Sequence, residues 1–452
     1  MNWEKLLNNG RFRPTRRPGG SDPRNDFESD FGRIIFSAAM RRMHDKTQVF
    51  PLTADDNIHS RLTHSMEVMA IGHSLGIRIC ESKEFQKLIG KTKTDLFREI
   101  PVLLKNACLV HDIGNPPFGH FGETVIQNFF TEYFKRPDAV KLSKVQQEDF
   151  TLFDGNAQGL RVLTKLQILN DATGLNLTYA TLAAYTKYPN AGIIDKKKIS
   201  TKKRGVFQTE KKYLDQISKE CGLFVGGNIV RHPLCYLMEA ADSICYLVMD
   251  IEDGFNKGWY NFDFILSKLK HIKGLQQAVN KIKKDKLNGY GDEITLMVNF
   301  RIYLIQRLVD LAYDNFIKNI GKISKGTYQK ELIKDDPQNL WEALQTFCIK
   351  EIFPKRDVTS LELTGHSVLT GLLNHYIDCI FYKGKDYQRR AASLMSGSIL
   401  RIAFVENKLP EKSNIDKLDD YFKLRIIVDF ISGMTDQFAL NHYQKLSGQK
   451  II

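Results

Sequence analysis

Apolar residues recur at helical spacing along most of the chain from Phe31 onward. Leu103, Ala107 and Val110, for example, fall on one side of a helix, and runs that alternate between apolar and polar positions are nearly absent. A spacing of three to four residues is typical of amphipathic helices, whereas half-buried strands alternate at every second residue. The pattern therefore predicts a mainly α fold.

Two segments break this pattern. Residues 9–27 are rich in Arg, Pro and Gly and contain few side chains that could pack in a core. Residues 111–122 contain two adjacent prolines, which cannot continue a helix. We therefore predict an extended N-terminal arm over residues 1–30, one large helical domain over residues 31–452, and an irregular loop inside that domain at residues 111–122.

The composition adds a strong positive charge. The 452 residues include 65 Lys and Arg against 52 Asp and Glu, which gives a formal net charge of +13. Polyanions are the expected partners, but charge alone does not separate nucleotide substrates from DNA, RNA or a membrane surface. The basic stretch Asp195–Gly205 fits either a solvated loop or a contact with a polyanion.

Cysteine usage and the N-terminal sequence bear on the cellular compartment. The seven cysteines are scattered and form no C-x-x-C pair, as expected for buried thiols in a reducing environment. Residues 1–17 lack the apolar core of a signal peptide, and no stretch approaches the roughly 18 consecutive apolar residues of a membrane span. These features predict a cytoplasmic protein without a membrane partner.

Four residues form a sparse series that suits one divalent metal ion: His64, the adjacent His111 and Asp112, and Asp242. Two neutral imidazoles and two carboxylates fill at most four positions of an octahedral ion, so positions remain for water and a substrate oxygen. A lone His-Asp pair is common by chance, and the hypothesis depends on the joint occurrence of all four. The chemistry that this set predicts is a hydrolytic metal centre.

The expected settings of these ligands are helical. Val102–His111 has the pattern of an apolar helix that Gly114 can end in a left-handed conformation. The His-Asp pair then lies at the C-terminal end of the helix, where free carbonyls favour a cation. His64 lies near the start of a second helix, and Asp242 lies on an otherwise apolar face of a third, over Leu237–Ile251. There an ionised carboxylate is costly unless it is paired or bound to a metal.

The sequence around these residues resembles the deoxynucleoside triphosphate triphosphohydrolases of the HD superfamily, most closely the bacterial members that act on dGTP. The matching segments keep the same order over nearly the whole chain, which is far more specific than an isolated His-Asp pair. They are Gly32–Ile35, Arg41–Arg42, Asp45–Leu52, Ser60–Val68, His111–Glu123, Gly155–Gln158, Glu239–Asp253 and Ile431–Asp436. The resemblance implies an HD-type helical core over about residues 50–260 and additional C-terminal helices over about residues 261–452.

This resemblance implies a reaction: hydrolysis of a deoxynucleoside triphosphate to the deoxynucleoside and inorganic triphosphate, by attack of water at the α-phosphorus. It also implies a divalent ion, Mn²⁺ or Mg²⁺ first, with Fe, Co, Ni and Zn compatible with mixed nitrogen and oxygen ligands. The leaving 5′ oxygen needs a proton donor. His120 and Glu123 match the family's active-site pair on the flexible turn after the metal ligands, and which of them is acid or base stays open.

Further residues are expected to bind the nucleotide. Arg61 can share a helix face with His64 and reach a phosphate oxygen. Asp242, Tyr246 and Asp250 recur every four residues and so form one stripe along a helix. By resemblance, Tyr246 packs where a 2′ hydroxyl would sit, and that hydroxyl would be desolvated without a partner. The other assignments by resemblance are the 3′ hydroxyl for Gln48 and Asp250, the triphosphate for Lys187, Tyr188 and Lys211, and guanine for Glu362.

Two other functions stay open on the sequence. An HD phosphodiesterase or nucleotidase would share the metal site without needing Gln48, Tyr246 and Asp250. A nucleic-acid-binding protein with a vestigial metal site would fit the charge, although no recognised nucleic-acid motif is present and the metal residues are intact. The family resemblance further implies a homo-oligomer, with a hexamer favoured, and single-stranded DNA as an effector.

Overall fold

The computed structural model of the chain confirms the mainly α fold. It describes residues 1–15, 22–50, 52, 57–167, 173–272, 275–276, 279–280, 282 and 292–450. Within these ranges the strands are one short antiparallel pair, β1 (Phe224–Val225) and β2 (Asn228–Ile229). Every helix in the same ranges is too short or too polar to serve as a transmembrane span.

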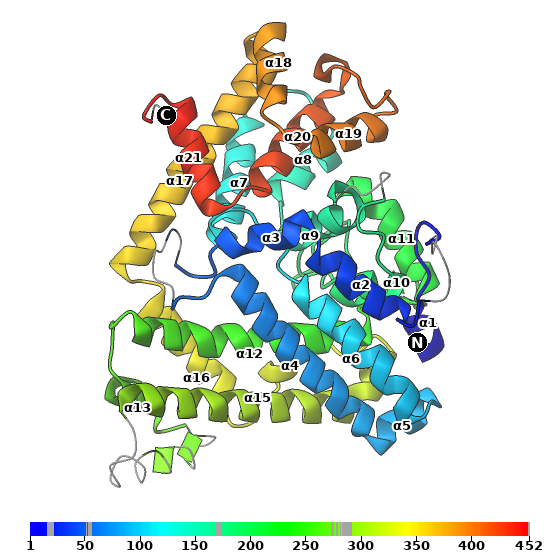
Figure 1. Cartoon of the computed structure of the whole chain (residues 1–452), viewed down its shortest axis with the longest axis vertical. Coiled ribbons are helices and arrows are strands. Elements are labelled where there is room, and N and C mark those ends of the chain that lie inside the picture. Colours follow the sequence, from blue (N-terminus) through cyan, green and yellow to red (C-terminus); the bar gives the residue numbers. More distant parts are fainter. Residues whose placement is uncertain are drawn as a thin grey trace.

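The helices fall into an N-terminal and a C-terminal series (Figure 1). The first comprises α1 (Trp3–Leu6), α2 (Asp26–Ile35), α3 (Ala38–Arg42), α4 (Arg61–Glu81), α5 (Lys83–Ile89), α6 (Lys93–Leu109), α7 (Gly119–Tyr133), α8 (Lys144–Thr151), α9 (Gly155–Arg161), α10 (Tyr179–Tyr185), α11 (Lys211–Glu220) and α12 (Pro233–Asn256). The second comprises α13 (Phe262–Leu269), α15 (Glu293–Ser324), α16 (Leu340–Phe347), α17 (Arg356–Ile377), α18 (Lys385–Ser393), α19 (Gly397–Glu406), α20 (Asp420–Ser432) and α21 (Asp436–Leu446).

Short helical turns of other types connect or extend these helices. The 3-10 turns are Met43–Asp45, Gln208–Glu210, Leu332–Lys334 and Ile415–Lys417, and the π turns are Val162–Leu166, Cys348–Ile352 and Asp378–Tyr382.

Capping residues explain where the site helices begin. Ser60 and Thr63 cap α4 reciprocally, because each side chain accepts a hydrogen bond from the backbone N–H of the other. Asp154 caps α9 by accepting from the N–H of Asn156. At α12 the cap is His232, and Pro233 takes the first helical position, where its missing N–H costs no hydrogen bond.

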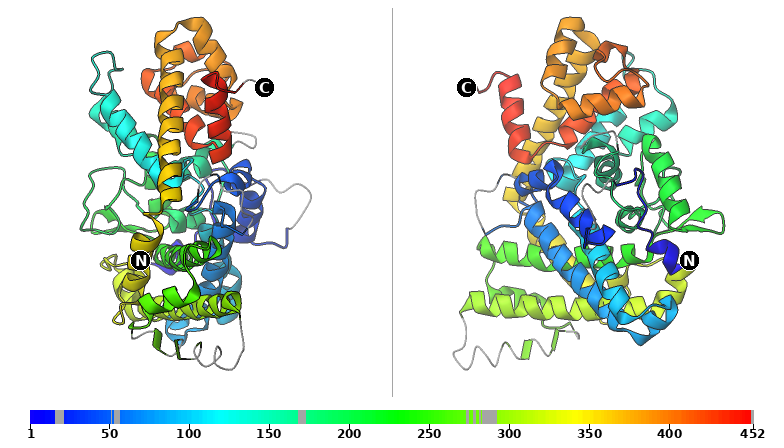
Figure 2. Two further views of the ribbon diagram at one scale, coloured as in Figure 1. Left: turned by 90° about the vertical axis from the view of Figure 1, so that its left-hand side faces the viewer. Right: turned by 45° about the vertical axis from the view of Figure 1, so that its right-hand side comes forward.

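Two hydrophobic cores lie on either side of the segment that joins α6 to α7. The first is built mainly from α4, α6, α10, α12 and α15, and the second from α7, α8, α17, α20 and α21. Ile113 belongs to the first core and Phe118 to the second, so the connecting loop crosses between them. The long α17 runs from the first core to the second, along one edge of the molecule in Figure 1 and facing the viewer in the left view of Figure 2. The cores do not follow the boundary near residue 260 that the resemblance implies, because α7 and α8 pack with the C-terminal helices.

The N-terminal segment is less separate than the expected arm. α1 buries Trp3 and Leu6 in the first core. The side chain of Arg11 is 4% exposed and pairs with the fully buried carboxylate of Asp30 at 2.5 Å. That pair ties the segment to α2, which already begins at Asp26. The sequence pattern missed this contact because a buried Arg-Asp pair has no hydrophobic signature.

Candidate metal centre and active-site cavity

Four side chains from three segments converge on one point. The ligand atoms of His64 (α4), His111 and Asp112 (after α6) lie within 4.8 Å of one another. Asp242 (α12) completes the group, since its Oδ1 lies 3.3 Å from Nε2 of His64 and 3.3 Å from Nε2 of His111. His111 Nε2 is also 3.5 Å from Oδ1 of Asp112. The mixed nitrogen and oxygen donors fit a divalent ion, as the sequence series predicts.

The hydrogen bonding of His111 favours metal binding. Its Nδ1 lies 2.8 Å from the carbonyl oxygen of Cys108, to which only a protonated Nδ1 can donate. In the neutral ring Nε2 then carries the lone pair, and this atom is buried without a well-aligned hydrogen-bond partner. Metal-binding histidines are commonly fixed in this way by a carbonyl on the far ring nitrogen.

The pKa shifts of His111, Asp112 and Asp242 indicate which of these groups are charged. Although burial opposes it, the carboxylates of Asp112 and Asp242 raise the pKa of His111 to about 9. Burial likewise opposes ionisation of Asp112, but the neighbouring His111 and Arg61 hold the pKa of its carboxyl well below the ordinary value. Two partly exposed carboxylates therefore stay ionised beside two imidazoles, an arrangement that attracts a divalent cation.

The loop that carries His111 and Asp112 differs in detail from the prediction. α6 ends at Leu109, and Gly114 does not adopt a left-handed conformation. Glycine is required there by close packing, because a Cβ atom would lie 2.0 Å from the backbone nitrogen of Gly159 in α9. The left-handed residues are instead Phe118, with φ of 62°, and Gly119, with φ of 57°. They turn the chain sharply into α7.

His120 and Glu123 lie on the first turn of α7, and not on a flexible turn as the sequence suggests. Nδ1 of His120 is 3.0 Å from Oε2 of Glu123, whose Oε1 accepts a hydrogen bond of 2.6 Å from the N–H of Gly155. The carboxylate of Glu123 raises the pKa of His120 by charge and by hydrogen bonding. The pair thus presents an exposed imidazole that is held from behind by a buried carboxylate.

A cavity of about 500 Å³ contains most of the predicted side chains. This volume suits a nucleotide-sized ligand. The predicted residues that line it are Gln48, Arg61, His111, Asp112, His120, Lys187, Tyr188, Asp242, Tyr246, Asp250 and Glu362. His64 and Glu123 do not line it; each is buried and touches a lining residue, Asp242 and His120 respectively.

Lys211 is placed elsewhere by the structure. It starts α11, its side chain is 61% exposed, and its Nζ lies 2.6 Å from Asp215 on the same helix. It borders a separate surface cavity beside β1 and β2. The match of Lys211 to a triphosphate-contacting lysine is therefore wrong for this cavity, because that assignment depended on local sequence and not on the direction of the helix.

Known proteins resemble the chain over its whole length. An HD domain matches residues 61–152, and a phosphohydrolase-associated domain matches residues 402–445. A deoxyguanosinetriphosphate triphosphohydrolase-like protein of Listeria innocua is 37% identical, covering 99% of this chain and 100% of the relative. A deoxyguanosinetriphosphate triphosphohydrolase of Salmonella arizonae is 32% identical, covering 93% of each. This chain belongs to the deoxyguanosinetriphosphate triphosphohydrolase family. It is therefore a hydrolase built on an HD domain, as the resemblance implies.

For this triphosphohydrolase family member, the basic loop contributes cations that the sequence did not assign to the site. Lys202 and Lys203 line the cavity, whereas Lys196 and Lys197 are exposed to solvent. Nζ of Lys203 lies 2.8 Å from Oδ2 of Asp154, the residue that caps α9. The C-terminal end of the loop, with Lys202 and Lys203, therefore fits a contact with an anion. The N-terminal end, with Lys196 and Lys197, fits a solvated loop. Lys334, Asn115 and Asn156 line the same cavity and were also missed.

The residues assigned to the sugar, Gln48, Tyr246 and Asp250, line the same cavity. The Oε1 atom of Gln48 is buried without a hydrogen-bond partner, so it is free to accept from a ligand. Burial and the neighbouring carboxylate of Asp253 raise the pKa of Asp250 well above its ordinary value. A protonated Asp250 can donate a hydrogen bond as well as accept one. Along α12, Tyr246 lies one turn after Asp242 of the metal-binding group and one turn before Asp250.

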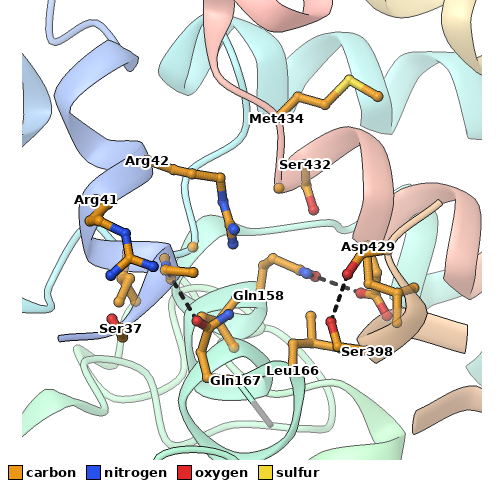
Figure 3. Close-up of a pocket in the computed structure, with 18 of the residues that line it drawn as sticks. Ser37, Arg41, Arg42, Gln158, Leu166, Gln167, Ser398, Asp429, Ser432 and Met434 are labelled. Atoms are coloured by element: carbon orange, nitrogen blue, oxygen red, sulfur yellow. Dashed lines mark hydrogen bonds between the residues drawn. The ribbon is translucent and has the colours of Figure 1, made fainter. Parts of the chain in front are cut away.

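A second cavity, of about 610 Å³, lies on the other side of the metal-binding loop. Figure 3 shows Arg42 of α3, Gln158 of α9 and Ser432 and Met434 near the end of α20 around it. Nε2 of Gln158 donates a hydrogen bond of 3.0 Å to Asp429. Neither His64, His111, Asp112 nor Asp242 lines this cavity.

Proposed function

We propose that the chain hydrolyses dGTP, and other deoxynucleoside triphosphates less well, to the deoxynucleoside and inorganic triphosphate by water attack at the α-phosphorus. One observation carries this proposal. His111, Asp112 and Asp242 of the metal-binding group, the imidazole of His120 and the residues assigned to the sugar line one cavity. The names of the relatives support dGTP as the substrate.

The metal-binding group has the donors for a divalent ion, and His64, His111, Asp112 and Asp242 would hold it. Such an ion would polarise an α-phosphoryl oxygen and lower the pKa of a bound water. Mn²⁺ or Mg²⁺ is our first choice, and Fe, Co, Ni and Zn also fit these donors.

His120 is suited to deliver a proton to the leaving 5′ oxygen. Glu123 raises the pKa of His120 and so favours the protonated ring, and Nδ1 is engaged by Glu123, which leaves Nε2 for the substrate. Glu123 keeps the ring in one orientation and balances its charge. General acid catalysis of this kind contributes on the order of 10²- to 10⁴-fold.

The cationic side chains around the metal group are suited to the triphosphate. Arg61 pairs with Asp112 through a short hydrogen bond, and Lys187 lies 3.6 Å from Oδ2 of Asp242. Both cations therefore stand beside the metal ligands, where the α-phosphate would lie. Lys203 reaches the cavity from the basic loop and is available for the outer phosphates after exchanging Asp154 for a phosphate oxygen.

Other residues that line the cavity are suited to a deoxyribose and a base. The ring of Tyr246 excludes a 2′ hydroxyl, and Gln48 and Asp250 bind the 3′ hydroxyl. Glu362 and Val358 of α17 and Phe353 just before it line the base end. Burial raises the pKa of Glu362, which lines the cavity, and its carboxyl would accept from the N–H groups of guanine.

Product identity tests the proposal. Purified protein with Mn²⁺ is incubated separately with dGTP, GTP and bis(4-nitrophenyl) phosphate, and the products are resolved by ion-exchange chromatography. Deoxyguanosine and inorganic triphosphate from dGTP, with little turnover of GTP, are expected. Pyrophosphate or single phosphate from dGTP would indicate a different HD phosphohydrolase activity and would refute the proposal.

A homo-oligomer, favoured as a hexamer, and an effect of single-stranded DNA are further parts of this proposal. They are supported by the family membership and the net charge of +13. Light scattering measures the first, and the dGTP rate with and without an oligonucleotide measures the second. A DNA effect that depends on phosphate contacts should weaken steeply with salt. The cytoplasmic location stays a prediction from the sequence.

A further inference from the structure

The C-terminal segment Ile431–Asp436 contacts two separate parts of the active site. The carboxylate of Asp436, which is 2% exposed, accepts 2.9 Å from the N–H of Phe118 through Oδ1. Its Oδ2 accepts 3.0 Å from the N–H of Thr47 and also accepts from the Thr47 hydroxyl. One buried carboxylate thus joins the segment before Gln48 to the turn before His120.

The turn at Phe118 needs such an anchor. A left-handed conformation is unfavourable for a residue with a side chain and persists where the surroundings hold it. The N–H of Phe118 is held by Asp436, and its ring packs against α17 at Gly365, where a Cβ atom would lie 2.7 Å from the ring. His120 follows two residues later, so the direction of its imidazole depends on this turn.

The segment that carries Gln48 is held in a similar way. Nζ of Lys46 is buried and donates to the carbonyl of Asn115 at 2.5 Å and to the carbonyl of Ser432 at 2.9 Å. Thr47 pairs through its backbone with Ser60, the cap of α4. Lys46 and Asp436 therefore connect the C-terminal segment to the segment that carries Gln48 and to the loop that leads to His120.

We propose that Asp436 is a positioning residue, which sets the distance between the group that binds the 3′ hydroxyl, Gln48, and the proton donor, His120. The inference rests on the proposed function, because that proposal assigns the 3′ hydroxyl to Gln48 and proton transfer to His120. It gives the C-terminal phosphohydrolase-associated segment a direct part in substrate selection, although none of its side chains lines the active-site cavity.

The main test is Asp436→Asn. An amide has one accepting oxygen, so its NH₂ group would face either the Phe118 N–H or the two donors of Thr47. We expect kcat/KM for dGTP to fall on the order of 10- to 100-fold, as for a small misplacement of reacting groups. The matched control is Asp420→Asn, which removes an exposed carboxylate from the first turn of α20 and should leave kcat/KM unchanged.

A second readout separates positioning from general destabilisation. 2′,3′-dideoxy-GTP lacks the hydroxyl assigned to Gln48, so the wild type should prefer dGTP. If Asp436 positions Gln48, the dGTP to dideoxy-GTP ratio of kcat/KM should fall about 5- to 10-fold in Asp436→Asn. A merely structural defect would lower the rates on both substrates equally and leave the ratio unchanged, which would overturn the inference.

Thr47→Val keeps the test decisive if Asp436→Asn does not fold. It removes one hydroxyl donor to Asp436 and preserves the side-chain shape. The dGTP to dideoxy-GTP ratio should fall while kcat on dideoxy-GTP is retained, and an unchanged ratio in this folded variant would overturn the inference. If the wild type releases no triphosphate from dGTP, the proposed function fails first, so the two failures are distinguishable.

Discussion

Glu123 holds the imidazole of His120 in place across the first turn of α7, with 3.0 Å between Oε2 and Nδ1. The other carboxylate oxygen of Glu123 is fixed by the N–H of Gly155, which follows the cap of α9. The orientation of the ring is thus set by two helices. Its protonation depends on the charge of Glu123.

Glu123→Gln should therefore change the pH dependence of the reaction. The carboxylate raises the pKa of His120, so the protonated acid persists to higher pH in the wild type. The variant loses that charge, the pKa of His120 falls, and the alkaline limb of the kcat profile should move to lower pH. A kcat lower by about 10²-fold is also expected. Glu132→Gln, an exposed position on the same helix, serves as the control; an alkaline limb at the wild-type pH in Glu123→Gln would contradict the assignment.

Removal of a metal ligand should weaken metal binding independently of catalysis. His111→Ala is expected to bind Mn²⁺ at least about 10- to 100-fold more weakly by isothermal titration calorimetry, because even outer contacts of metal ligands have effects of this size. His73→Ala, on the same helix as His64, should bind as the wild type does. Undiminished Mn²⁺ binding by His111→Ala would rule out this site.

Metal affinity should also depend on pH. In the metal-free protein Asp112 and Asp242 raise the pKa of His111 to about 9, so below that pH a proton occupies the ring. Metal binding must displace it. The Mn²⁺ association constant should therefore rise about tenfold per pH unit below pH 9 and level off above it, and the same titrations in buffers of different ionisation enthalpy should show release of about one proton.

The two ends of the basic loop offer a matched pair of lysine variants. Lys203→Ala should raise KM for dGTP by about 10-fold, the cost of one hydrogen bond between charged groups. Lys196→Ala, seven residues earlier and exposed, should leave KM unchanged. Steady-state kinetics at constant ionic strength make the comparison, and equal KM values for the two variants would show that only the overall charge of the loop matters.

A buried cluster of ion pairs that involves two C-terminal helices, α19 and α20, should contribute strongly to the free energy of unfolding. Arg161 is fully buried and binds Glu210, Glu406 and Asp429, each at 2.8 Å. Arg161→Met leaves three carboxylates without their common partner and should lower the free energy of unfolding by about 3–5 kcal/mol. Arg389→Met, which breaks an exposed pair with Asp386, should cost less than about 1 kcal/mol. Urea unfolding followed by circular dichroism compares them.

The sequence predicted the parts of the site that depend on local spacing. The stripe Asp242-Tyr246-Asp250 follows from helical periodicity, and all three side chains line one cavity. The metal group required only that the helices bearing His64 and Asp242 pack together. Long-range geometry was not predictable in the same way, because the directions of α7 and α11 depend on tertiary contacts. His120 consequently lies on a helix and not on a loop, and Lys211 points to another surface.

Buried polar contacts also escaped the sequence. The pairing of Arg11 with Asp30 and the carbonyl contacts of Lys46 join segments far apart in the chain, and neither leaves a periodic pattern. The basic loop shows the same limit, since its six cations look alike in the sequence, although the fold turns only Lys202 and Lys203 into the cavity.

The single uninterrupted α12 carries Asp242, which we assign to the metal, and Tyr246 and Asp250, which we assign to the sugar. Eight residues of helix correspond to about 12 Å that cannot stretch without unwinding. Glu362, which we assign to the base, lies instead on α17. Under the proposed function, sugar and base selection therefore depend on different helices, and substitutions along α17 should change which nucleobase is accepted without admitting ribose.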